Sequence, residues 1–250
     1  MPVDSPSRQR PTTVSVNCFD CQKRDRSTWC LLSRGDVDTL NQMKHTILYQ
    51  RGQIIFRQGD PCNGIYLVES GTVAVRKTDE YGNSILVRMR HQGDAVGYRD
   101  FFQDNLFSVT AEALAPSKIC FVDRGAVQRL LQRNPALGLQ FIRSIGQDLG
   151  TAEDAILQAA VFPVRKRLAH LLLSLKDRYA AVTDDGVMTI DLPLSRQDIA
   201  SILGARRETI ARAIHDLEAD EVAAFSGRKV IVHDLDLLLD ELEPPEEAPL

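Results

Sequence analysis

The feature that most constrains the fold of this 250-residue chain is a change in the spacing of its apolar residues near residue 134. Between residues 47 and 122, short apolar runs such as GQIIF, GIYLVESGTVAV and KICFV alternate with glycine and aspartate turn signals. Such runs predict an antiparallel β-barrel or jelly roll. After Asn134 and Pro135 the apolar residues recur every three or four positions, which predicts helices. The sequence therefore indicates an α+β protein with a β-domain followed by a helical part.

The first helical segment, residues 134–162, carries an apolar stripe whose steps of three and four residues match the a and d positions of a coiled coil. Phe162 and Pro163 end or kink it. A helix that packs only on its own domain needs a similar stripe. We expect a dimer interface instead, because the helix joins two domains and its spacing is strict. The predicted interface residues are Ile142, Ile145, Leu149, Ala152, Ile156 and Ala159.

The segments that follow predict a winged helix-turn-helix. An amphipathic helix covers residues 164–179, and Ser195 is a good N-cap for the next helix, RQDIASIL. Gly204 makes the turn into a further helix, ARRETIARAIHDLEAD. The sequence VAAFSGRKVIVHD then predicts two short strands around Ser226 and Gly227, which form a wing.

The helix that begins near residue 206 has the residues that reading DNA requires. Arg207, Glu208 and Arg212 share an outward face, where arginine can pair with guanine and glutamate can accept a hydrogen bond from cytosine. A solvent-exposed helix with a Glu208–Arg212 ion pair has the same pattern. The surrounding helix-turn-helix and wing favour DNA binding. The apolar residues expected on the inward face are Ile210, Ile214 and Leu217.

The net charge of −4 does not exclude a nucleic-acid partner. Residues 234–250 hold seven acidic residues and no basic one, which leaves residues 1–233 with a net charge of +3. DNA binding depends on a local basic face rather than on total charge.

Several other function classes are not indicated. No apolar run approaches the roughly 18 residues of a membrane span, and the N-terminus does not resemble a signal sequence, so we expect a cytoplasmic protein without a membrane partner. No nucleophile–base pair, phosphate loop or histidine-rich metal motif is present, so we do not expect an enzyme.

The cysteines indicate metal or redox chemistry. Cys18, Cys21 and Cys30 form C-x2-C-x8-C ahead of the β-domain, and Cys120 lies in its last predicted strand. Four thiolates can hold an iron–sulfur cluster or a tetrahedral zinc ion. A thiol–disulfide switch is a further alternative. Cys62 is either a small loop residue or a substitute fourth ligand.

Haem is a weaker hypothesis. His45, His91 and Cys62 are of the residue types that bind haem iron. No pair of them has a diagnostic spacing, and lone histidines are more often surface or core polar residues.

LSRQDIASILGARRETIARAIHDLE, after a barrel and a long helix, resembles the CRP/FNR family of bacterial regulators, and the resemblance covers residues 18–233. It implies a cyclic-nucleotide-binding-like jelly roll and a homodimer on a palindromic double-stranded DNA site. In relatives, the loop equivalent to residues 78–84 contacts RNA polymerase. The wing residues would bind phosphates. The expected DNA-binding residues are Ser195, Arg196, Gln197, Arg206, Arg207, Glu208, Thr209, Arg212, Ser226, Arg228 and Lys229.

A cyclic nucleotide is not the expected ligand. Family members that bind one carry G-E and, some ten residues later, R-S or R-T, because the phosphate needs an arginine. Here no glutamate follows Gly97, and Phe107 and Ser108 stand where the arginine pair belongs. Arg99 is the remaining source of positive charge.

The cysteines instead resemble those of the FNR branch, in which an oxygen-sensing [4Fe-4S] cluster is bound by three N-terminal cysteines and one further along. The resemblance implies Cys18, Cys21, Cys30 and Cys120 as ligands, although the family spacing before the third cysteine is usually shorter.

The resemblance also divides the chain into a mobile arm (1–17), a sensory β-domain (18–133), a dimerisation helix (134–162), a winged helix-turn-helix (163–242) and an acidic tail (243–250). The alternative is a regulatory module that binds no DNA.

Overall fold

A computed structural model describes residues 12–20, 27, 29–182 and 187–243, which form two compact units. The first unit holds residues up to 83 and 87–146, and the second holds residues 84–86 and those from 147 onward. Each unit has its own hydrophobic core and is described separately below. Within the described residues, no helix is both long enough and apolar enough to cross a membrane.

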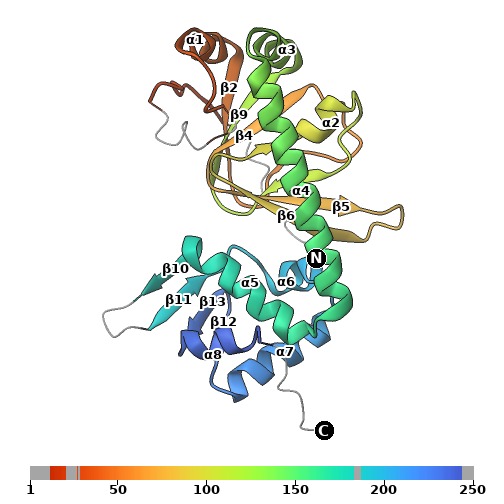
Figure 1. Ribbon diagram of the computed structural model, residues 1–250, viewed down its shortest axis with the longest axis vertical. Coiled ribbons are helices and arrows are strands. Elements are labelled where there is room, and N and C mark those ends of the chain that lie inside the picture. The colour runs from red at the N-terminus through yellow and green to blue at the C-terminus, as the bar shows by residue number, and fades with distance from the viewer. Residues whose placement is uncertain (1–11, 21–26, 28, 183–186, 244–250) are drawn as a thin grey trace, which may run out of the picture. The chain divides into compact units, whose positions relative to one another are not determined.

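The first unit is built on two antiparallel sheets, which confirms the predicted β-domain (Figure 1). The order of one sheet is β1-β2-β9-β4-β7, and that of the other is β3-β8-β5-β6. The strands are β1 (Thr12–Val14), β2 (Lys44–Tyr49), β3 (Ile54–Phe56), β4 (Gly64–Ser70), β5 (Thr72–Thr78), β6 (Ser84–His91), β7 (Ala95–Val96), β8 (Thr110–Ala113) and β9 (Ser117–Asp123).

Strand β1 differs from the expectation of a mobile arm over residues 1–17. Its register pairs Thr13 with Ile47 and Val14 with Thr46 of β2. Two threonines and a valine are β-branched and favour an extended strand. Residues 1–11 lie outside the described part of the chain.

Helices α1 (Arg34–Met43), α2 (Tyr98–Phe102) and α3 (Arg124–Arg133) precede the long α4 (Pro135–Val161). The sequence placed the first helix after residue 134, so α1, α2 and α3 were missed. A capping box begins α1, because the Ser33 hydroxyl accepts a hydrogen bond from the Asp36 amide (3.2 Å). Helices α1 and α3 lie side by side (Figure 1), and Arg133 Nε is 3.3 Å from Asp36 Oδ1.

The core of the first unit joins the sheets to the beginning of α4. Leu137 and Phe141 of α4 are fully buried. The ring of Trp29 meets that of Phe141 edge-on, with 5.8 Å between the centroids. The segment before α1 is therefore packed directly against the long helix.

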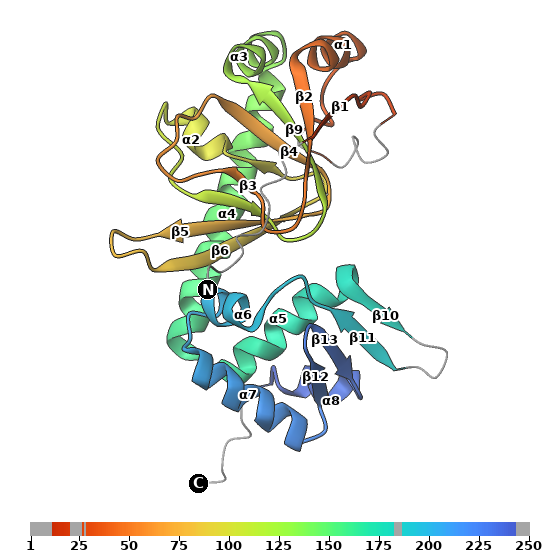
Figure 2. The same cartoon turned by 180° about the vertical axis from the view of Figure 1, so that it is seen from behind.

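The second unit combines a helix-turn-helix with a four-stranded sheet of order β10-β11-β13-β12 (Figure 2). The predicted helices and the wing are confirmed. Strands β10 and β11 were missed, because three or four residues are too few to reveal a period of two. The elements are α5 (Val164–Tyr179), β10 (Ala180–Val182), β11 (Met188–Asp191), α6 (Arg196–Ile202), α7 (Arg207–Ala219), β12 (Ala223–Ser226), β13 (Lys229–Val232) and α8 (Leu235–Asp240).

The turn between α6 and α7 depends on Gly204, whose φ of +59° lies in the left-handed region. The chain closes there through a hydrogen bond from the Ala205 amide to the Ala200 carbonyl (2.9 Å). The buried Arg167 of α5 donates to the Leu203 carbonyl just before the turn. This bond ties the end of α6 to the body of the unit.

We expect Gly204→Ala to lower the free energy of unfolding by about 1–2 kcal/mol, because alanine is strained at this φ. A β-carbon at Gly204 would meet no atom within 4 Å, so the cost is purely conformational. Gly146 of α4 has equally open surroundings, and Gly146→Ala should raise the free energy of unfolding by about 0.5–1 kcal/mol. Urea titrations of both variants test this, and effects of the same sign would contradict it.

Candidate DNA-contacting surface and cysteine site

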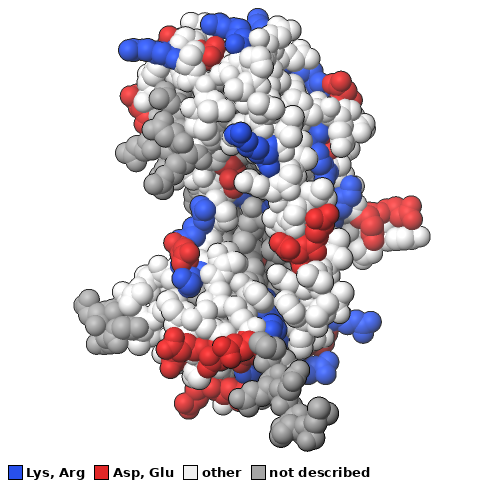
Figure 3. Space-filling view, viewed as in Figure 1, with Lys and Arg blue, Asp and Glu red and all other residues white. Residues whose placement is uncertain are grey.

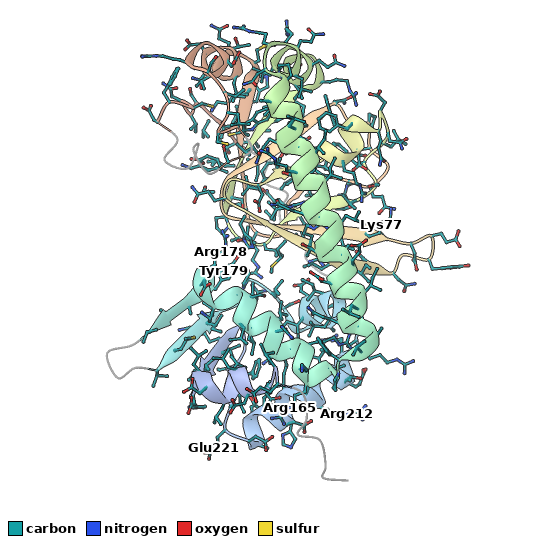
Figure 4. All side chains as sticks on the ribbon, viewed as in Figure 1. Lys77, Arg165, Arg178, Tyr179, Arg212 and Glu221 are labelled. Carbon is teal, nitrogen blue, oxygen red and sulfur yellow. The ribbon has the colours of Figure 1, made fainter. Side chains whose placement is uncertain are left out.

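Helix α7 presents its polar residues to solvent and its apolar residues to the unit. Arg207, Glu208 and Arg212 are exposed, and the Arg212 side chain extends beyond the ribbon at the edge of the unit (Figure 4). The residues that anchor the opposite face are Ile210, Ala213, Ile214 and Leu217, all buried. The structure thus brings the three predicted base-reading residues together on one rigid helix.

A groove of about 410 Å³ runs along this face. Arg196, at the start of α6, forms part of its wall and lies over the ring of Phe225 in the wing, 4.8 Å from the centroid. Burial lowers the pKa of Arg196, which the nearby Glu218 partly offsets. Its Nη1 atom is buried without a hydrogen-bond acceptor among the described residues. Arg196 is thus held at the wall of the groove by its contact with the Phe225 ring. The groove is lined by Arg196, Arg207, Glu208, Ile210, Ala211 and Ile214.

The remaining predicted contacts differ in accessibility. Gln197, Arg206, Ser226 and Lys229 are exposed, whereas Thr209 and Arg228 are partly buried. The Ser195 hydroxyl accepts a hydrogen bond from the Asp198 amide (3.1 Å) and donates to Asp198 Oδ2 (2.7 Å). Ser195 therefore serves first to begin α6, as its N-cap.

The acidic C-terminal residues are partly neutralised within the second unit. Figure 3 shows acidic side chains gathered on the face that carries α8. Glu241 accepts a hydrogen bond from Arg165 Nε (2.8 Å), and Asp220 of the α7 end also pairs with Arg165. The Glu241 carboxylate is the largest cause of the raised pKa of Arg165. The Glu241 carboxylate is thus held against α5.

The cysteine site lies in the first unit, where Cys18 and Cys120 line the same cavity. Cys120 is 5% exposed, and its Sγ is 3.4 Å from Thr46 Oγ1. The Cys18 amide donates to Asn41 Oδ1 of α1 (2.7 Å). Burial raises the pKa of the Cys120 thiol, and the nearby Cys18 raises it further. Two thiols that are far apart in the sequence are therefore neighbours. The cavity is lined by Val16, Cys18, Trp29, Leu40, Lys44, Leu67, Glu69, Cys120 and Val122.

The donor set of this cavity fits a sulfur-ligated metal group. Besides the two thiols, the buried Trp29 Nε1 lines it without a hydrogen-bond acceptor among the described residues. Such a donor is costly to leave unpaired, by about 1–3 kcal/mol. The free volume is about 20 Å³, which is room for a single water molecule. A larger group would have to displace the partly exposed Cys18 side, because Cys120 and Trp29 belong to the core.

Two of the other three cysteines lie in the described part of the chain. Cys30 directly follows Trp29 and is partly exposed, whereas Cys21 lies outside the described residues. Cys62 is buried near the start of β4, with its Sγ 3.6 Å from the Gly64 carbonyl oxygen. Cys120 pairs with Leu67, three residues further along β4. This position does not favour Cys62 as a partner of Cys18. The described residues contain no group of three or more His, Cys, Asp or Glu arranged for a metal ion.

Aromatic rings pack against one another in the β-domain next to Gly97. Phe107 stacks on Phe56 with 3.9 Å between centroids and also contacts Tyr66. Burial raises the pKa of Tyr66 to about 12. Arg99 donates to the Ser108 hydroxyl rather than pointing into this interior as an unpaired charge. Phe107 thus belongs to the hydrophobic core, and the expectation that a cyclic nucleotide is not the ligand stays a prediction.

The histidines considered for haem are separated. His45 is exposed on β2 of the first sheet, and His91 ends β6 in the second sheet. Neither lines the cavity that holds Cys18 and Cys120.

The predicted apolar stripe runs along α4. Ile142, Leu149 and Ile156 are 63%, 59% and 70% exposed. Ala152 and Ala159 are also exposed, and Ile145 is partly buried against the core.

Two family models match the chain. The model of the cyclic nucleotide-binding domain matches residues 46–134, and that of the Crp-like helix-turn-helix domain matches residues 166–241. These matches cover the β-domain and the helix-turn-helix described above.

Similar curated proteins are regulators. The transcriptional activator protein FnrL of Cereibacter sphaeroides is 30% identical over 92% of this chain and 93% of its own length. An anaerobic regulatory protein of Bacillus subtilis is 26% identical over 86% of this chain and 87% of its own length.

Solved structures share the fold. FixK2 from Bradyrhizobium japonicum has a TM-score of 0.69 at 23% identity and covers 81% of this chain and 98% of its own. The c-di-GMP responsive regulator CLP of Xanthomonas campestris has a TM-score of 0.71 at 20% identity, with 81% and 100% covered.

Proposed function

The chain belongs to the CRP/FNR family of DNA-binding transcription regulators, and we propose that it senses oxygen or redox state through a [4Fe-4S] cluster that controls dimerisation and DNA binding. The observation that carries this proposal is the meeting of Cys18 and Cys120 at one cavity. The family consists of transcription regulators rather than enzymes, in agreement with the sequence. A cytoplasmic location stays a prediction.

Cys18, Cys21, Cys30 and Cys120 would hold the cluster, whose reactivity toward oxygen or nitric oxide supplies the signal. Its assembly would fix the cysteine segment to β9. Two contacts then connect this segment to α4. Trp29 packs on Phe141, and Asn134 Nδ2 donates to the Leu31 carbonyl oxygen (2.8 Å). The effect of losing the cluster would therefore be transmitted to the long helix through Trp29 and Leu31, the residues on either side of Cys30.

We infer that the exposed stripe on α4 is the dimer interface. A row of large apolar side chains at a and d spacing is stable in water when a second helix covers it. A two-fold dimer places two α7 helices on a palindromic site. Because the stripe has few apolar layers, modest changes in α4 suffice to shift the dimer equilibrium.

RNA polymerase is the proposed protein partner of the loop between β5 and β6. The Asp79 carboxylate accepts hydrogen bonds from the amides of Tyr81 (2.9 Å) and Asn83 (2.8 Å). Bonds from Asn83 and the loop backbone lower the pKa of Asp79. The loop thus has a defined shape and presents Tyr81, 83% exposed, to solvent.

Arg207→Ala should weaken binding to a palindromic duplex by about 10- to 100-fold, because one base-reading arginine contributes about 1–3 kcal/mol. Arg178→Ala, at the exposed end of α5, is the control and should leave affinity nearly unchanged. Fluorescence anisotropy at several salt concentrations measures both. Affinity that is independent of salt and of Arg207 would instead indicate a module that binds no DNA.

Anaerobic reconstitution of Cys120→Ser should lose most bound iron and acid-labile sulfide, because a buried ligand is removed. Cys62→Ser should retain wild-type amounts of both. The reverse pattern would make Cys62 the fourth ligand. Wild-type protein that stays colourless and free of sulfide would refute the cluster while leaving DNA binding intact.

Ile156→Glu should weaken dimer association at least about tenfold, because it buries a charge in an apolar interface. Leu157→Glu is a matched control, since Leu157 is 58% exposed on the same helix but lies off the stripe. Sedimentation equilibrium gives both dissociation constants. Equal effects would show that the stripe is not the interface.

A further inference from the structure

Trp29 combines properties that its packing role alone does not require. It is the only tryptophan of the chain and is 2% exposed. Its indole nitrogen is buried with no hydrogen-bond acceptor among the described residues. Buried tryptophan N–H groups usually find a partner. The described residues around the indole therefore supply no acceptor for its N–H group.

The surroundings of the indole indicate the chemistry of that acceptor. Trp29 lines the cavity together with the thiols of Cys18 and Cys120, and Cys30 is the next residue. Sulfur in a thiolate or an inorganic sulfide accepts hydrogen bonds, and such bonds tune iron–sulfur clusters. Glu69 Oε2 lines the same cavity and also has no hydrogen-bond donor among the described residues. The Trp29 N–H group and the Glu69 carboxylate are thus not hydrogen-bonded to each other.

The indole is also held in place independently of the thiols. Trp29 packs edge-on against Phe141 of α4 and belongs to the hydrophobic core. Cys18 is only partly exposed to solvent and packs on the edge of that core. When the cavity expands to admit a larger group, the Cys18 side can move farther while the indole stays packed on Phe141.

We infer that the Trp29 indole N–H donates a hydrogen bond to a sulfur atom of the cluster, either a cysteine thiolate or a sulfide, and slows its oxidation. This inference rests on the proposed function. A hydrogen bond withdraws electron density from the sulfur, so the cluster becomes harder to oxidise. Trp29 is a positioning and tuning residue, not a ligand, and the cluster should still assemble without its N–H.

The test compares wild type, Trp29→Phe and Leu40→Val after anaerobic reconstitution. Trp29→Phe keeps an aromatic ring but removes the N–H, whereas Leu40→Val changes the packing of the same cavity and removes no polar group. Resonance Raman spectra in H₂O and D₂O detect exchangeable hydrogen bonds to the cluster sulfurs. We expect one isotope-sensitive Fe–S band to be lost only in Trp29→Phe. Its absorbance should also decay about five- to tenfold faster in air.

Wild-type protein provides a second measurement that needs no substitution. Labelling with ¹⁵N-indole tryptophan gives one side-chain N–H resonance, because the chain has one tryptophan. This resonance should move downfield when the cluster assembles. A resonance that stays in place, or identical isotope shifts in Trp29→Phe and wild type, would overturn the inference alone. Wild type that binds no cluster would overturn the proposed function as well.

Discussion

The edge-on contact between Trp29 and Phe141 is the interaction on which the proposed sensor depends. One ring belongs to the cysteine segment and the other to α4, the helix that continues out of the first unit. Aromatic pairs of this kind bury large apolar areas in a fixed geometry. Because the interior is close-packed, a displacement of Trp29 cannot be absorbed locally and has to move Phe141. The polar bond from Asn134 to Leu31 reinforces the same connection.

The DNA-binding unit uses rigidity for a different purpose. The side chains proposed to read bases are on α7, whose inward face is anchored by four buried residues. The preceding α6 is fixed by its capping box and by Arg167. A site built on such elements needs little ordering when DNA binds. The proposed sensing site and the proposed DNA-reading helix therefore belong to separate units that share one chain and one long helix.

The sequence predicted those parts of the structure that repeat a pattern over many residues. The stripe of α4, the Ser195 cap and the Gly204 turn could all be predicted from the sequence, because each is set by local residues. Helix α1 was missed because its apolar residues, Val37, Leu40 and Met43, are few and are separated by polar residues. The meeting of Cys18 and Cys120 was expected only by resemblance. It depends on the pairing of β2 with β9, which brings Thr46 opposite Cys120 across a long loop. The unpaired indole is a three-dimensional property that no spacing reveals.

Because Trp29 is the only tryptophan of the chain, it can also serve as an intrinsic fluorescent probe of the cysteine site. With one indole in the chain, intrinsic emission comes from a single buried point beside the thiols and the long helix. An iron–sulfur group quenches a nearby tryptophan by energy transfer, whereas zinc or an empty cavity does not absorb at the near-ultraviolet wavelengths at which tryptophan emits. The brightness of unlabelled protein therefore distinguishes these occupants of the site in real time, while DNA and oxygen are added to the same cuvette.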